Sequence, residues 1–105
     1  MNSEMLMNKY GREVRLITRG WSSPIFKAFI QPYRSINGGV ICEKPNTALI
    51  ITPPTHDIAA LDKPSNYVFI INQKKYRILQ AEKVMELGVH VYSYGIIEQI
   101  KEEHR

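Results

Sequence analysis

Two stretches near the start of the chain alternate between apolar and polar residues with the two-residue period of a β-strand. Residues 12–18 set Val14 and Leu16 against charged neighbours, which is typical of a strand with one buried face. In residues 25–31 every second position from Phe26 onward is apolar and faces one side. Pro32 has no amide hydrogen for the next ladder bond, so this pattern predicts a second strand that ends there.

The second half of the chain carries the clearest hairpin signal. Two apolar, β-rich runs, residues 67–71 and 74–80, are separated by Asn72 and Gln73 alone. Residues 68–71 are apolar at every position, which predicts a central strand covered on both faces.

Two more strands and one ambiguous stretch complete the pattern. Residues 47–52 form a β-rich run closed by two prolines, and residues 89–97, rich in Val, Tyr and Ile, form the last strand. Residues 80–87 fit either a helix that ends at Gly88 or a continuation of the preceding strand. With six predicted strands and only one or two short helices, the chain is assigned to the all-β class.

The segments between the strands are predicted to be short helices, turns or loops. Ser3 is a suitable N-cap, so we expect residues 1–10 to form an arm or short helix that ends before Gly11. We expect Trp21 to fold back from a turn as a lid on the core. The remaining expectations are a long loop at 33–46, a single helical turn within 55–63 and a frayed tail at 98–105.

Length and composition indicate one folded domain. A chain of 105 residues, 44% of them hydrophobic and 23% charged, is too short for two cores and too apolar for a disordered protein. Its apolar runs are far below the roughly 20 residues that cross a bilayer, and the N-terminus lacks the pattern of an export leader. We therefore expect a cytoplasmic origin and no membrane association.

The formal net charge of +4 lies entirely in the first half of the chain. Residues 1–52 hold seven Lys or Arg against three Asp or Glu, whereas residues 53–105 hold seven of each. The basic residues of the first half are spread out, so they predict a moderately basic face rather than a dense binding run.

Few residues of the chain could act in catalysis or bind a metal. Cys42 stands alone, which excludes an intramolecular disulfide and a multi-thiolate zinc site; a catalytic thiolate would need His56 or His90 nearby. His56, Asp57 and Asp62 are interpreted as solvated loop residues rather than as metal ligands. With no recognisable catalytic spacing, we expect no enzymatic activity, no cofactor and no metal.

Four segments of the chain together resemble the small head-tail joining proteins of tailed phages, and most closely the XkdH-like proteins of PBSX-type prophages. These segments are YG at 10–11, KAFIQP at 27–32, LIITP at 49–53 and KYRILQAE at 75–82. The resemblance covers roughly residues 10–97.

This resemblance implies a small antiparallel β-barrel or sandwich with a helical embellishment. It favours a long hairpin, residues 74–84 with 89–97, over a helix at 80–87. Because Gln73 stands where such hairpins often carry Gly, and Gln is costly at positive φ, we expect a longer turn or one of another type.

The function that the resemblance implies is structural. The family forms an oligomeric ring of the virion, assembled in the host cytoplasm, which continues or closes the DNA channel below the portal and connector. Its partners are other phage structural proteins on the head and tail sides, with contact to packaged DNA possible. We expect the 33–46 loop to supply the contacts; the candidate interaction residues are Arg34, Asn37, Gly38, Gly39 and Lys44.

The competing interpretation is a small nucleic-acid-binding β-barrel. Such a protein would combine base stacking on aromatic rings with neutralisation of phosphates on one basic face. The candidate residues are Lys27, Phe29, Tyr33, Arg34 and Tyr76.

Overall fold

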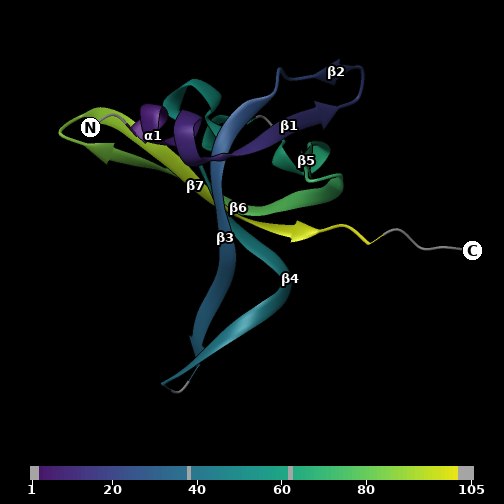
Figure 1. Cartoon of the computed structure of the whole chain (residues 1–105), viewed down its shortest axis with the longest axis vertical. Coiled ribbons are helices and arrows are strands. Elements are labelled where there is room, and N and C mark those ends of the chain that lie inside the picture. Colours follow the sequence, from purple (N-terminus) through teal and green to yellow (C-terminus); the bar gives the residue numbers. More distant parts are fainter. Residues whose placement is uncertain (1–2, 38, 62, 102–105) are drawn as a thin grey trace, which may run out of the picture.

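The computed structural model describes residues 3–37, 39–61 and 63–101, and of residues 3–5, 34–37, 40–44 and 65 it describes the backbone. Short helices accompany an extensive sheet (Figure 1). The elements are α1 (Ser3–Tyr10), β1 (Arg12–Thr18), β2 (Trp21–Ser22), β3 (Phe26–Asn37), β4 (Val40–Thr52), the 3₁₀ turns η1 (Pro54–His56), η2 (Ile58–Ala60) and η3 (Pro64–Asn66), β5 (Val68–Ile71), β6 (Lys74–Glu86) and β7 (Val89–Gln99).

Six of the strands close into an antiparallel β-barrel. Their order is β1-β3-β4-β7-β6-β5, and β1 pairs with β5 to complete the circle, while the short β2 lies beside β1. Because β1 pairs with β5, the barrel part of the sheet lacks the exposed edges that an open sheet would have. The predicted all-β class is confirmed, and of the two predicted architectures the barrel is the one observed.

The core follows from the alternation along each strand. Phe26 and Ala28 of β3 are buried, whereas Lys27 between them lies on the outer side and is partly exposed. The same alternation on the other strands, together with Ile58 of η2, yields one connected cluster inside the barrel. Its members are Val14, Leu16, Phe26, Ala28, Ala48, Ile50, Ile58, Phe69, Ile71 and Ile97.

Helix α1 packs closely against β3, and Gly11 makes this approach possible. A Cβ atom at Gly11 would overlap the carbonyl oxygen of Met7 and would lie 2.9 Å from that of Ala28. The Gly11 amide donates to the Met7 carbonyl at 2.7 Å and so closes the helix. Met7 is buried yet lies outside the barrel cluster, so the helix covers a separate small apolar surface.

The predicted loop at 33–46 is wrong, because this segment is a β-hairpin. β3 continues past Pro32 to Asn37, and β4 begins at Val40 and runs back into the barrel. Pro32 is tolerated because β1 pairs with β3 only at residues 26–28, which leaves that side of β3 without a ladder at Pro32. Figure 1 shows β3 and β4 extending together away from the rest of the molecule.

The stretch at 80–87 is strand rather than helix. β6 continues to Glu86 and pairs with β7 as far as Val89, across a two-residue turn in which Leu87 and Gly88 both have positive φ. The β5–β6 turn is likewise two residues long, since Ile71 pairs with Lys74. The expected longer turn is wrong: Asn72 and Gln73 both adopt positive φ, at 52° and 66°, as in a type I′ hairpin.

Three further predictions differ from the structure. Trp21 is not a lid on the core: it is half exposed and its ring meets that of Tyr67 edge-on, with centroids 6.3 Å apart. The segment after Thr52 forms three short 3₁₀ turns rather than one helical turn. The last strand extends to Gln99, two residues beyond the predicted end and into the segment expected to fray; residues 102–105 lie outside the described part.

Candidate functional site

The predicted interaction residues lie on the hairpin that projects from the barrel. We call residues 33–37 and 39–46 the β3–β4 arm. Along the arm Arg34 pairs with Glu43, and Asn37 pairs with Val40 at the end of the hairpin. Gly39 is exposed, has φ of 85° and has no other atom within 4 Å of its Cβ position. Gly38 and the side chains of Arg34, Asn37 and Lys44 lie outside the described residues.

The arm is joined to the barrel by a large bulge. Pro32 pairs with Ala48, and the next pair is Arg34 with Glu43, so that one residue of β3 faces the four residues 44–47 of β4. Asn46 within this bulge has φ of 64°, a conformation that Asn adopts more readily than most residues. Because bulges bend the strand that carries them, this site sets the angle between arm and barrel.

Beyond the bulge the arm is a two-stranded ribbon. β4 pairs with β7 only at residues 47–52, and β1 reaches β3 only at residues 26–28, so in the described pairings no third strand supports residues 34–37 or 40–43. Isolated two-stranded hairpins are marginally stable in water. Their open edges also offer unpaired backbone groups to a neighbouring chain.

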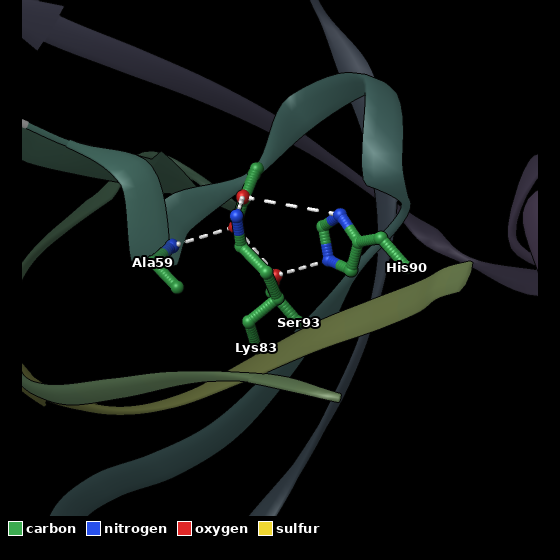
Figure 2. Close-up of polar contacts among 5 residues, drawn as sticks. Ala59, Lys83, His90 and Ser93 are labelled. Carbon is green, nitrogen blue, oxygen red and sulfur yellow. Dashed lines mark hydrogen bonds and ion pairs between the residues drawn. The ribbon is translucent and has the colours of Figure 1, made fainter. Parts of the chain in front are cut away.

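A second polar feature lies where the segment after β4 meets the β6–β7 hairpin. We call Asp57, Lys83, His90 and Ser93 the polar cluster (Figure 2). The Ser93 hydroxyl donates to Asp57 Oδ1 at 2.5 Å, and the Ala59 amide donates to the same oxygen at 2.9 Å. Lys83 Nζ lies 3.2 Å from Asp57 Oδ2. The cluster therefore ties the 3₁₀ segment to both strands of the hairpin.

The prediction that Asp57 is a solvated loop residue is wrong, and Asp62, for which the same was predicted, lies outside the described residues. Its side chain is only 14% exposed, and its carboxylate accepts from a buried hydroxyl and from the Ala59 amide of η2, the turn that it caps. Burial by itself raises the pKa of Asp57. Hydrogen bonds from Ser93, Lys83 and the Ala59 amide outweigh that effect and hold the pKa below its ordinary value.

The cluster contains Ser, His and Asp, but their arrangement differs from a hydrolytic triad. In a triad the serine hydroxyl donates to the histidine, and the other ring nitrogen donates to the aspartate. Here Ser93 donates directly to Asp57, so its Oγ accepts from the Nε2–H of His90, with Nε2 and Oγ 2.9 Å apart. The second ring nitrogen, Nδ1, is 3.9 Å from Asp57 Oδ2, and Ser93 is fully buried. The polar cluster is therefore suited to holding the 3₁₀ segment after β4 in place and not to attacking a substrate.

Cys42 is not brought to either histidine that was considered as its base. It lies on the arm opposite Ser35, ten residues before the barrel end of β4. The bulge and the barrel part of β4 lie between Cys42 and Thr52, and both His56 and His90 lie beyond that end of the strand.

The residues proposed for nucleic-acid binding do not share one surface. Tyr76 packs against the barrel core, whereas Lys27 and Phe29 lie on the outer face of β3 and are partly exposed. Tyr33 lies in the bulge, and the Arg34 side chain is outside the described residues.

Sequence reasoning missed the polar cluster because its members are far apart in the chain: 36 residues separate Asp57 from Ser93. The one local signal is a serine in the middle of an apolar strand. In the described part of the chain no group of three or more metal-ligating side chains gathers, and no helix there is long and apolar enough to span a membrane. No family profile, curated protein or solved structure matches the sequence.

Proposed function

We propose that this protein is a structural component of a phage or prophage virion that joins head to tail, as one subunit of a ring that continues or closes the DNA channel below the connector. The resemblance of four segments to the head-tail joining family supports this proposal. The barrel with a projecting arm supports it as well, because such a shape suits a part that docks between neighbours.

The β3–β4 arm is the observation that carries the proposal. A ribbon of two strands that leaves its barrel and has no third strand gains little stability on its own. It is suited to gaining that stability from a partner, through backbone pairing along an open edge and through polar side chains. The arm reaches the adjoining ring or the channel lumen, with Arg34, Asn37 and Lys44 as polar contacts. An arm in the lumen would also meet packaged DNA.

Deletion of residues 36–43 tests this function. The deletion removes the end of the arm but leaves every pairing of the barrel strands, so the variant should fold and its melting temperature should stay within a few degrees of the parent. Heads and tails made with it should fail to join. A control is Gln73→Gly, which changes a different hairpin turn at a positive φ and should leave joining intact. Normal infectious particles from the deletion variant would refute the proposal.

Binding of single-stranded nucleic acid is the second candidate, favoured by the outward Lys27 and the partly exposed Phe29 beside each other on β3. Affinity for an oligonucleotide that falls steeply with salt, and falls further in Phe29→Ala, would favour this function. Joining requires no such affinity, so the two candidates are separable in one preparation.

A further inference from the structure

One end of the barrel is open, at the place where the β3–β4 arm leaves it. Residues of β1, β3, β4, β5 and β6 line a pocket there, with a volume of about 260 Å³. We call it the mouth pocket. The lining residues that matter below are Arg12, Ile30, Thr47, Ile71, Asn72 and Tyr76.

The opposite end of the barrel is closed. Ile58 of η2 is fully buried in the core cluster, and a Cβ atom on Gly95 of β7 would lie 3.0 Å from its Cδ1. Phe69 and Ile97, which are also fully buried, fill the interior between the two ends. The open end therefore leads to a blind pocket and not to a channel.

The walls of the mouth pocket are apolar. Ile71 is buried at its base, whereas Ile30 and the ring of Tyr76 are partly exposed and pack against the core cluster. A cavity of roughly 150 Å³ holds benzene, so this pocket can take a molecule of roughly ten non-hydrogen atoms. Pockets in the mouths of β-barrels typically bind such compact molecules through apolar walls and a few polar groups.

The rim of the pocket carries positive charge. Arg12 lies opposite the fully buried Ala28, so it belongs to the inward face of β1, and it is exposed at the end of that strand. Lys74 lies opposite Ile71 across the β5–β6 turn and is exposed at the same end of the barrel. Among the residues that the structure describes, neither of these two cations has an ion-pair partner.

The carboxylates nearest to the pocket do not neutralise this rim. Glu13 lies on the outer face of β1, opposite Lys27. Glu98 lies opposite Thr47 in the β4–β7 ladder, but Arg77 binds its carboxylate at 2.6 Å. Two cations without partners above an apolar base favour a ligand that is an anion at one end and apolar at the other.

We propose that the mouth pocket binds a small organic carboxylate, in which one carboxylate group is attached to one aromatic or branched aliphatic group. The apolar group enters between Ile30 and Tyr76, and the carboxylate stays at the rim, where the Arg12 guanidinium binds it beside Asn72. This site goes beyond head-tail joining and does not rest on it, since binding is a property of the purified protein.

The first test is a titration of the purified, isotopically labelled full chain with phenylacetate, followed by nuclear magnetic resonance. Phenylacetate should bind saturably with a Kd below about 1 mM. The amide signals that shift should be those of the lining residues 30–31, 47–48 and 71–72. Phenylacetamide, a neutral analogue of the same shape, should bind at least about 10-fold more weakly, because it lacks the charge that Arg12 recognises.

A matched pair of substitutions on β1 tests the role of the rim charge. Arg12→Gln should weaken phenylacetate binding by at least about 10-fold and leave phenylacetamide binding unchanged. Arg15→Gln removes an arginine that is also exposed but lies on the outer face of the same strand, so this variant should bind phenylacetate like the parent. Because both side chains are exposed, the melting temperatures of the two variants should stay within a few degrees of the parent.

Several results would overturn the inference. They are the absence of saturable shifts up to about 10 mM phenylacetate, equal affinities for phenylacetate and phenylacetamide, and an equal loss of affinity in Arg12→Gln and Arg15→Gln. Acetate or inorganic phosphate that binds as tightly as phenylacetate would also overturn it, because the apolar walls would then have no role. A peptide with a C-terminal phenylalanine that binds more tightly than phenylacetate would replace the small molecule by the C-terminus of a partner polypeptide.

Discussion

The hydrogen bond between Ser93 and Asp57 should be one of the larger single polar contributions to the stability of the barrel. Asp57→Ala removes the bond from a buried hydroxyl, worth about 1.5–3 kcal/mol because its acceptor is charged. It also removes the capping bond from the Ala59 amide, worth about 1 kcal/mol. The ion pair with Lys83 adds less than about 1 kcal/mol, since that side chain is 45% exposed. Together these predict a loss of about 2.5–5 kcal/mol in the free energy of unfolding.

A double-mutant cycle isolates the bond itself. We expect Asp57→Ala and Ser93→Ala, measured singly and together by urea unfolding followed by circular dichroism, to show a coupling energy of about 1.5–3 kcal/mol. The melting temperature of Asp57→Ala should fall by at least about 10 °C.

The pair Glu82 and Tyr94 on the same hairpin is the matched control. Tyr94 donates to Glu82 at 2.7 Å, a bond of the same chemistry, but this pair is exposed to solvent. That bond raises the pKa of Tyr94. Because the pair is exposed to solvent, the bond should contribute much less to the free energy of unfolding than the bond between Ser93 and Asp57. A coupling energy between Asp57 and Ser93 no larger than that of the control pair would contradict the argument that burial makes this hydrogen bond strongly stabilising.

Two further predictions concern the same region of the barrel. Thr52 lies opposite Ser93 in the β4–β7 ladder, is fully buried, and its hydroxyl is the one side-chain oxygen or nitrogen in the described residues that is buried without a partner. Thr52→Val keeps the shape and removes that hydroxyl, so thermal unfolding should show a gain of about 1 kcal/mol; a loss of similar size would mean that the hydroxyl has a partner. The second prediction concerns pH: the pKa of Asp57 is lowered on folding, so its stabilisation is complete above its ordinary value of 3.8 and is lost as the pH falls through the lowered value. Urea midpoints measured from neutral to acidic pH should therefore fall more steeply for the parent than for Asp57→Asn, and equal slopes would contradict this assignment.

Local pattern was enough to locate the strands of the barrel, because each has one face in the core and one outside. The prediction that residues 68–71 are covered on both faces is wrong, since only Phe69 and Ile71 of that strand are buried. The arm was predicted to be a loop for two physical reasons. Its strands have no core to face and so carry no sustained alternation, and Pro32 is a residue that usually ends a strand. The signal that was available is the Asn-Gly-Gly sequence at 37–39, since a glycine pair between β-rich residues is typical of a hairpin turn. Pro32 stops a strand only where its missing amide hydrogen is needed, and pairing on both sides of a strand cannot be read from one stretch of sequence.

The candidate sites were less predictable than the fold. Asp57 and Ser93 meet because the barrel places the segment after β4 over the β6–β7 hairpin, and no spacing in the chain encodes that approach. Similarly, Arg12 is indistinguishable in sequence from an arginine on the outer face of a strand. Its position at the mouth pocket emerges only once its pairing with Ala28 fixes the register.

The two strands of the arm are the same strands that build the barrel, and this continuity has a mechanical consequence. A pull on the end of the arm acts along β3 and β4 together, so it loads the hydrogen bonds that hold these strands to β1 and β7 in shear and all at once. A pull across a sheet would instead open its rungs one after another, as in a zipper. Attachment through the arm therefore transmits tension into the stiffest direction of the barrel, and the bulge at residues 44–47 is the compliant joint that lets the load line up with the strands.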